Sequence, residues 1–227
     1  MLYVRKFAII LLGGEGLRFG GDAPKQYMPF RRKPLFFYAI SKFNFDSIDG
    51  YVIVSDPKYN GLIEDYARSH GVEKPITFAP AGKNRQESVF NALSSIKEED
   101  TIVLIHDGDR PNINRRIIKN NIKAVEDGYV ALTAVKINDS IFKGEEEMVS
   151  SYLDRKDTYR AQTPQSFLLK DILKFHKTAR EEGLSFHDDA SLAFHYGMKA
   201  KIIEGSVTNI KITTKDDLKL LERIIDD

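Results

Sequence analysis

The stretch that decides the fold is residues 7–21, which read FAIILLGGEGLRFGG. Its first six residues are apolar, and glycines follow at once. A continuous apolar run ended by glycines is typical of a strand that is buried on both faces of a parallel sheet. The glycines can bring backbone N–H groups close to phosphate oxygens, because they carry no Cβ. We therefore predict a buried strand followed by a phosphate-binding loop.

The rest of the chain repeats this beginning, with apolar runs separated by stretches of helical spacing. Strands that alternate with helices are typical of a doubly wound sheet, so the predicted fold class is a Rossmann-like, mostly parallel α/β sheet. The further predicted strands are 51–54, 76–78, 102–105, 130–135, 199–204 and 208–212. The predicted helices lie at 35–40, after 57, at 88–93, 117–125, 168–183 and 188–196, and from 214 onward.

The alternation is interrupted at residues 136–160, which are polar and charged and include the run Glu145-Glu146-Glu147. About 25 residues without structure are uncommon in a compact domain. A protruding arm that packs on a second subunit explains the segment better than a loose loop. We see no repeat, linker or second domain. We therefore predict a single domain over 1–227 that carries a dimerisation arm at about 136–160, and hence a homodimer.

The amino-acid composition excludes several classes of function. Lys and Arg (34) almost balance Asp and Glu (33), so no bulk field attracts nucleic acid or an anionic membrane, and neither is a predicted partner. The absence of cysteine excludes disulfides, thiolate metal sites and a cysteine nucleophile. The first residues lack the order of a secretory signal, and the longest apolar run is too short to span a bilayer. We expect a cytoplasmic protein.

The glycine loop does not match two familiar phosphate motifs. The dinucleotide fingerprint needs a glycine where Phe19 stands, and the P-loop needs Gly-Lys-Ser/Thr, whereas Gly21 is followed by aspartate. The loop does carry two cations seven residues apart, Arg18 and Lys25. Such a pair could hold a triphosphate and neutralise charge at its α-phosphorus. The alternative is a strand-to-helix turn with ordinary surface cations.

Five segments, in order, resemble the sugar-phosphate nucleotidyltransferases, and more narrowly the 2-C-methyl-D-erythritol 4-phosphate cytidylyltransferase family of the non-mevalonate isoprenoid pathway. Ribitol-5-phosphate cytidylyltransferases share much of the pattern. The resemblance covers about residues 7–225. The segments are LGGEGLRFG with PKQY (12–20 and 24–27), GKNRQESV (82–89), HDGDRP (106–111), YRAQTPQSF (159–167) and NIKITT (209–214).

The resemblance implies a CTP site with Mg²⁺ or another divalent cation. Asp107 follows a predicted buried strand, where open α/β sheets bind ligands, and a carboxylate with phosphate oxygens and water suits Mg²⁺. Ser88 offers a donor and an acceptor, although a serine near a helix start is also an ordinary cap. The implied catalytic residues are Arg18, Lys25 and Lys211, and the implied nucleotide-binding residues are Leu12, Gly13, Gly14, Gly16, Gly82 and Ser88.

For the acceptor, the resemblance implies a site completed across a dimer by the arm. Ser140 replaces the family's usual threonine and keeps the hydroxyl, and Arg155 is either a phosphate clamp or a solvated arm charge. The implied acceptor-binding residues are Asp107, Arg110, Ser140, Arg155 and Thr163. Two residues depart from the family. Leu12 stands where many relatives have alanine, and Asp109 stands where they have a small residue.

The expected reaction is the transfer of CMP from CTP to the phosphate of 2-C-methyl-D-erythritol 4-phosphate, with release of pyrophosphate. One alternative keeps the chemistry but uses ribitol 5-phosphate as the acceptor. Another is a nucleotide-binding module without catalysis, which the departures at Leu12 and Asp109 keep open. A nicotinamide-dependent oxidoreductase is a third alternative, and Phe19 argues against it.

Overall fold

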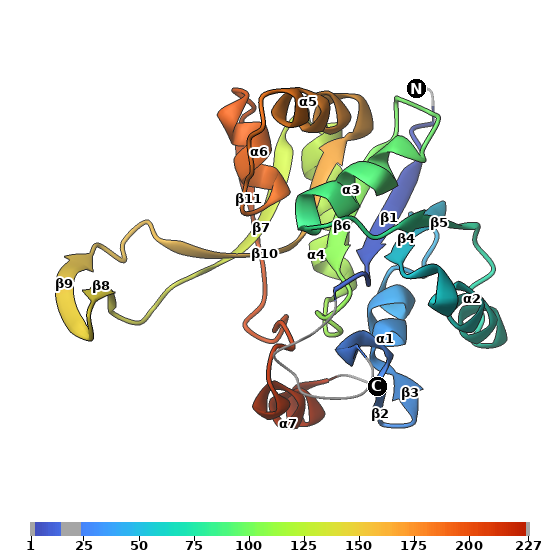
Figure 1. Cartoon of the computed structure of the whole chain (residues 1–227), viewed down its shortest axis with the longest axis horizontal. Coiled ribbons are helices and arrows are strands. Elements are labelled where there is room, and N and C mark those ends of the chain that lie inside the picture. The colour runs from blue at the N-terminus through green and yellow to red at the C-terminus, as the bar shows by residue number, and fades with distance from the viewer. Residues whose placement is uncertain (1–2, 15–23, 226–227) are drawn as a thin grey trace.

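A seven-stranded sheet forms the centre of the computed structural model, which describes residues 3–14 and 24–225 (Figure 1). Six strands run in the same direction, and β10 runs antiparallel to both of its neighbours, β6 and β7. In spatial order the strands are β11 (Ala200–Glu204), β7 (Val130–Lys136), β10 (Tyr159–Leu168), β6 (Ile102–Asp107), β1 (Lys6–Leu11), β4 (Gly50–Ser55) and β5 (Ile76–Pro80).

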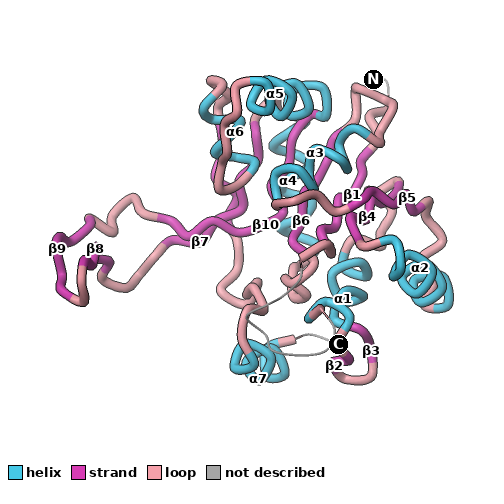
Figure 2. Tube along the Cα trace, in the orientation of Figure 1, coloured by secondary structure: helices cyan, strands magenta, loops and turns pink. Residues whose placement is uncertain are grey.

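Helices cover both faces of this sheet (Figure 2). Side chains alternate between the faces of a strand, so Ala8 and Ile10 of β1 belong to one core cluster while Ile9 belongs to the other. This arrangement confirms the predicted doubly wound, mostly parallel sheet. In the described part of the chain, no helix has the length and apolar character needed to cross a membrane. The first cluster includes residues of α1 (Leu35–Lys42), α2 (Asn60–Ser69) and α4 (Arg115–Glu126), and the second includes residues of α3 (Arg85–Ser94), α5 (Leu169–Glu181) and α6 (Asp189–His195).

The arm is a hairpin that projects from the body, reached through β7 and left through β10 (Figure 1). It consists of β8 (Ile141–Glu145) and β9 (Met148–Leu153), joined by a turn in which Glu146 and Glu147 both have positive φ. The predicted protrusion is therefore present. Its contact with a second subunit stays a prediction.

The last helix, α7 (Lys215–Ile224), begins where the sequence predicts it. Thr214 and Asp217 form a reciprocal capping box at its first turn. The helix packs through Leu221 in a small cluster that also contains Phe30 and Ile212. This packing fixes the segment before α7 beside the end of β6. The remaining short elements are η2 (Lys25–Tyr27), η3 (Pro57–Tyr59), β2 (Pro29–Phe30) and β3 (Lys33–Pro34).

Two secondary-structure predictions need correction. Residues 208–212 are not a strand: Ile212 N–H donates to the carbonyl of Asp109 at 2.8 Å, and the Asn209 amide donates to the carbonyl of Thr163 at 2.9 Å. Single contacts to the loop after β6 and to Thr163 of β10 hold the segment, so its alternating pattern does not mark a strand. Conversely, residues 159–167, read only as a motif, lie in β10.

Candidate active site

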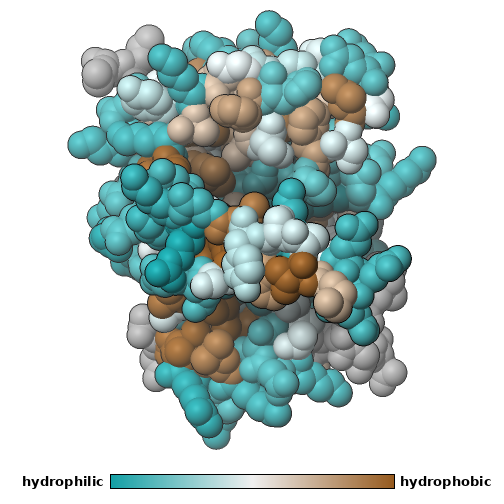
Figure 3. All heavy atoms as spheres, turned by 90° about the vertical axis from the view of Figure 1, so that its left-hand side faces the viewer, coloured by the Kyte–Doolittle hydropathy of each residue, from teal (hydrophilic) through white to brown (hydrophobic). Residues whose placement is uncertain are grey.

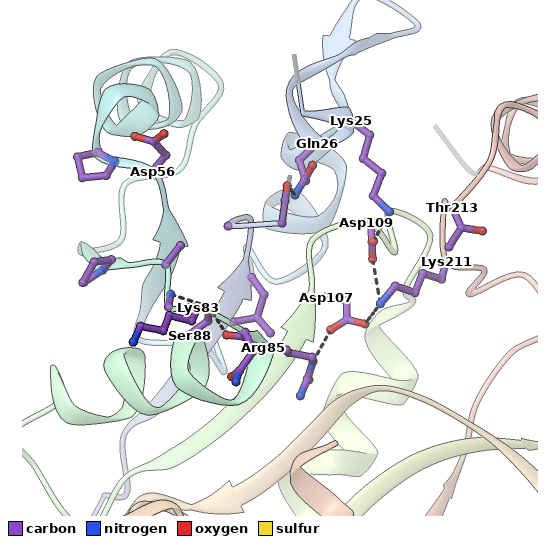
Figure 4. A pocket seen from close by; sticks show the side chains of 18 residues that line it. Lys25, Gln26, Asp56, Lys83, Arg85, Ser88, Asp107, Asp109, Lys211 and Thr213 are labelled. Atoms are coloured by element: carbon purple, nitrogen blue, oxygen red, sulfur yellow. Dashed lines mark hydrogen bonds and ion pairs between the residues drawn. The ribbon is translucent and has the colours of Figure 1, made fainter. Parts of the chain in front are cut away.

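A cavity of about 830 Å³ lies at the carboxyl ends of the parallel strands β1, β4, β5 and β6 (Figure 4). Open α/β sheets bind ligands at this edge, because the loops that leave parallel strands gather there. The wall is formed by residues 13–14 after β1, 56–57 after β4, 80–85 after β5, and Asp107 with Asp109 after β6. Lys25 with Gln26 and the residues before α7 also line it, so residues from six parts of the chain meet around one space.

Three basic side chains of the wall reach two carboxylates (Figure 4). Lys211 Nζ lies 2.9 Å from Asp107 Oδ2, and Arg85 Nε lies 3.2 Å from Asp107 Oδ1. Lys25 Nζ lies 2.7 Å from Asp109 Oδ2. Lys25 belongs to η2, Arg85 to the first turn of α3, and Lys211 to the segment before α7. The cavity thus contains an alternating network of cations and anions.

The two carboxylates differ in their electrostatics. Burial by itself would raise the pKa of Asp107, but the charges of Arg85 and Lys211 outweigh burial and hold that pKa well below its usual range. For Asp109, the neighbouring positive charges do not outweigh the effect of burial on the pKa. Burial and the neighbouring charge of Asp107 raise the pKa of Asp109, although Lys211 and Lys25 oppose the change. Asp107 is therefore the firmly ionised member of the pair.

His106 and Thr163 support the end of β6 from beneath the cavity. Burial lowers the pKa of His106 to about 4, so its ring is neutral at pH 7. Its Nε2 lies 3.0 Å from the carbonyl of Arg110, and its Nδ1 lies 3.0 Å from Thr163 Oγ1. The same Thr163 oxygen accepts the backbone N–H of Asp107 at 3.1 Å. These contacts fix the direction of the Asp107 side chain.

A second charged layer lies behind Arg85. Its Nη1 is 2.7 Å from Asp189 Oδ2, and His176 Nε2 is 3.2 Å from the other oxygen of Asp189. Both Asp189 and His176 are almost fully buried. Sequence reasoning missed this layer, even though Arg85 lies in the segment 82–89 that carried the resemblance. The one indication in the sequence was Arg85 itself, a basic residue in the first turn of a predicted helix for which no ionic partner had been assigned.

The loops after β1 and β5 are held by close packing and by side-chain hydrogen bonds. A Cβ on Gly13 would lie 2.5 Å from the Cβ of Ala81, so no larger residue fits there without movement. The Gln26 amide donates to the carbonyls of Leu12 (3.1 Å) and Gly14 (2.8 Å), which fixes the described end of the loop after β1. Gln26 is a further supporting residue that the sequence did not single out.

Ser88 holds the loop between β5 and α3. Its hydroxyl accepts the N–H of Gly82 at 2.9 Å and donates to the carbonyl of Asn84 at 2.9 Å. A Cβ on Gly82 would meet the side chain of Glu87 at 2.6 Å, so the turn is tightly packed. Ser88 lines the cavity as expected, but its hydroxyl already has partners within the loop.

Most of the predicted residues of the nucleotide and catalytic sites meet in the cavity. Gly16 and Arg18 lie outside the described residues. Leu12 does not line the cavity: its side chain is buried in the core and lies where a Cβ on Gly108 would be 2.2 Å away. Its side chain therefore packs in the core, and its part in nucleotide binding stays a prediction. The predicted residues that line the cavity are Gly13, Gly14, Lys25, Gly82, Ser88, Asp107 and Lys211.

The predicted acceptor residues are more scattered. Arg110 and Thr163 lie behind Asp107 and do not line the cavity: the guanidinium of Arg110 is 3.8 Å from Asp107 and donates to the carbonyl of Asn209. Ser140 and Arg155 are exposed on the arm, which extends away from the body that contains this cavity (Figure 1). Within one chain, only Asp107 of this set lines the cavity.

The chemistry around Asp107 fits a divalent cation bound together with phosphate groups. Mg²⁺ commonly takes one or two carboxylates and fills its other positions with phosphate oxygens and water. Asp107 lines the cavity beside Lys211, so one protein carboxylate and a bound polyphosphate would suffice. Among residues 3–14 and 24–225 there is no group of three or more His, Cys, Asp or Glu side chains placed to hold a metal alone. Any cation here would therefore depend on its substrate.

A doubly wound sheet, a glycine turn after β1 and clustered cations at the strand ends define a nucleotidyltransferase of the Rossmann-like class. The sequence profile of the 2-C-methyl-D-erythritol 4-phosphate cytidylyltransferase family matches residues 7–227. The chain belongs to this family, which confirms both the resemblance and the predicted enzyme class.

Named relatives align with nearly the whole length of this chain. The chain is 35% identical to a 2-C-methyl-D-erythritol 4-phosphate cytidylyltransferase of Geobacillus thermodenitrificans over 219 residues, or 96% of both sequences. It is 36% identical to a ribitol-5-phosphate cytidylyltransferase of Vibrio parahaemolyticus over 226 residues, which are 96% of this chain and 95% of the relative. The crystal structure of 4-diphosphocytidyl-2C-methyl-D-erythritol synthase from Anaerococcus prevotii superposes with a TM-score of 0.85 at 24% identity, covering 97% of this chain and 95% of that one, and supports the fold.

Proposed function

We propose that this protein transfers CMP from CTP to the phosphate of 2-C-methyl-D-erythritol 4-phosphate and releases pyrophosphate. The observation that carries the proposal is the convergence of Lys25, Arg85 and Lys211 on Asp107 and Asp109 in a cavity at the strand ends. The choice of acceptor rests on the family and on several relatives that carry this name. The product would be an intermediate of isoprenoid synthesis, made in the cytoplasm.

In the proposed complex, the triphosphate lies between Lys25 and Lys211, and the cytosine lies against the backbone of the loop at 81–83. These two parts of the cavity wall come from different segments and face the same space. Arg18, which follows the described end of the glycine loop, would add a third cation to the phosphates. The basic side chains would neutralise charge as it develops at the α-phosphorus.

The proposed step is an in-line displacement. An oxygen of the acceptor's phosphate forms a bond to the α-phosphorus of CTP, and the bond from that phosphorus to the bridging oxygen of the β-phosphate breaks. Pyrophosphate leaves with the bonding electrons. The attacking phosphate is already anionic, so positioning and charge neutralisation replace a strong general base. Mg²⁺ held at Asp107 would supply Lewis-acid polarisation of the phosphate oxygens.

We further propose that the enzyme is a homodimer in which the arm of one subunit completes the cavity of the other. Several large apolar side chains of the arm are exposed, including Phe142 (54%), Met148 (73%) and Tyr152 (73%). Figure 3 looks onto the side from which the arm projects and shows hydrophobic residues at the surface among polar ones. Exposed apolar clusters mark interaction surfaces. Ser140 and Arg155 would then reach the acceptor bound to the partner.

The second candidate acceptor is ribitol 5-phosphate, favoured by the 36% identity to the Vibrio relative. We would supply CTP, Mg²⁺ and each acceptor separately, and measure pyrophosphate together with the CDP-linked product. The main proposal predicts a kcat/KM at least about 100-fold higher with the methylerythritol compound. A preference for ribitol 5-phosphate would overturn the choice of acceptor. No pyrophosphate with either compound would overturn the proposed activity.

A further inference from the structure

Asp109 makes a buried contact with a proposed catalytic lysine. Its side chain is 12% exposed, and its Oδ2 lies 2.7 Å from Lys25 Nζ (Figure 4). Lys25 also donates to the carbonyl of Ile212 at 2.5 Å, while the N–H of Ile212 donates to the backbone carbonyl of Asp109. Asp109 and Ile212 therefore hold Lys25 from two sides.

This arrangement uses much of the binding capacity of Lys25. An ammonium group has three N–H donors, and two of them are engaged by Asp109 and Ile212. The charge of Lys25 is also balanced by the carboxylate. Lys211 is nearer to Asp107 (2.9 Å) than to Asp109 (4.0 Å), so Asp109 is chiefly the counter-ion of Lys25.

We propose that the Asp109 carboxylate competes with the nucleotide's phosphates for Lys25, and so sets how tightly CTP binds. The inference rests on the proposed function, which places the triphosphate at Lys25. In the nucleotide-free protein, the carboxylate compensates a lysine whose side chain is only 12% exposed. When the triphosphate enters, it takes over this compensation, and the nearby carboxylate then repels it. Asp109 is thus a positioning residue that acts through Lys25.

The direct test is the dissociation constant of CTP, measured by titration calorimetry with Mg²⁺ and without an acceptor. We expect Asp109→Asn to bind CTP roughly tenfold more tightly than the unmodified protein, because the amide keeps the size but not the charge. Asp109→Ala, with a small side chain, should change affinity in the same direction. Melting curves of both variants would verify that they are folded. A purely structural role predicts the opposite sign, since a distorted cavity binds more weakly.

The matched control is Asp56→Asn. Asp56 lines the same cavity on the side away from Lys25, and its carboxylate pairs with Lys58 (Figure 4). The substitution removes the same charge from the same space. We expect a gain in affinity several-fold smaller than that of Asp109→Asn, because solvent screens the exposed Asp56. Equal gains from the two variants would overturn the role of the Lys25 contact.

A double-mutant cycle gives the sharpest test. If Asp109 acts through Lys25, Asp109→Asn should no longer tighten CTP binding in a protein that already carries Lys25→Ala. A gain that persists in the Lys25→Ala background would overturn the proposal. An unchanged or higher dissociation constant for CTP in the single variants would also overturn the proposal. If the affinity falls only when Mg²⁺ is present, Asp109 is a metal ligand and the proposal is overturned as well. Absence of CTP binding by the unmodified protein would instead overturn the proposed function.

Discussion

The cavity and the arm differ in how their side chains are matched with partners inside the chain. In the cavity, buried charged side chains are matched with one another: Asp107 meets Lys211 and Arg85, and Asp109 meets Lys25. In the arm, side chains such as Tyr152 are apolar and exposed. A buried charge requires a partner, and the cavity supplies it within one chain. The exposed apolar side chains of the arm lack such cover within the described chain.

The difference teaches how the proposed activity is divided. The proposed nucleotide-binding residues are assembled by the fold of a single chain, since strand order brings the ends of β1, β5 and β6 together. The proposed acceptor residues of the arm gain a function only beside another subunit. Each experiment below separates these two halves of the site or shows that the division is wrong.

The largest effect is expected in the cavity. Lys25→Ala and Lys211→Ala should each lower kcat by about 10²- to 10⁴-fold, because each removes charge stabilisation at the reacting phosphates. Both variants should remain folded at the assay temperature, with a melting temperature lowered by the loss of a partner for a buried carboxylate. Lys219→Ala, on the exposed surface of α7, is the matched control and should keep full turnover. Near-normal turnover in both cavity variants would contradict the mechanism.

The next effect tests whether the arm serves the partner. Arg155→Ala should lower kcat/KM for the acceptor by about 10- to 100-fold, because an arginine–phosphate contact is lost. Mixing this variant with Lys25→Ala under conditions of subunit exchange should restore activity. Half of the dimers are then hybrids, and each hybrid has one intact site, so about a quarter of the normal activity should return. Failure of the mixture to regain activity would place the complete site in one chain.

A smaller effect concerns assembly itself. Phe142 and Tyr152 lie on the two strands of the arm with ring centroids 6.1 Å apart. Tyr152→Glu should shift sedimentation from dimer toward monomer, because a charge would be buried in an apolar contact. Leu62→Glu, at an exposed apolar position of α2, is the control and should leave the sedimentation unchanged. A dimer that persists in Tyr152→Glu would show that the arm does not hold it together.

Sequence reasoning located the cavity well. A continuous apolar run ended by glycines marks β1, and the next buried runs mark its parallel neighbours, so ligand binding at their carboxyl ends follows from the fold class. It also placed Asp107 and Lys211 in one site, although this step needed the resemblance. Hydrophobic periodicity and composition are read over a few consecutive residues. Buried strands and glycine turns are local features of this kind, so the sequence can predict them.

What the sequence did not reveal depends on contacts between distant segments. No local pattern tells that Lys25 meets Asp109, that Arg85 meets Asp189, or that the Leu12 side chain faces the core. The strand predicted at 208–212 fails for the same reason. Its residues alternate as in a strand, yet the backbone N–H groups of Asn209 and Ile212 donate to the carbonyls of Ser206 and Asp109, which lie outside the strands.

The final prediction concerns stability and involves the layer behind the cavity. Burial alone would raise the pKa of Asp189, but Arg85 and His176 outweigh it and lower that pKa below the ordinary 3.8. A carboxyl whose pKa is lowered by folding stabilises the protein above its unfolded pKa and loses that contribution as the pH falls through the folded value. Asp189→Asn should therefore melt about 5 to 10 °C below the unmodified protein at pH 7.

This difference in melting temperature should shrink as the pH is lowered below about 4, because the carboxyl of the unfolded chain then takes up a proton while the folded carboxyl, whose pKa is lower, still resists it. Asp56 offers the comparison: its pKa is also lowered, by a hydrogen bond from Lys58, but its side chain is about half exposed. Asp56→Asn should shift melting far less at every pH. A constant deficit of Asp189→Asn down to pH 3 would mean that Asp189 stabilises the cavity wall by shape rather than by charge.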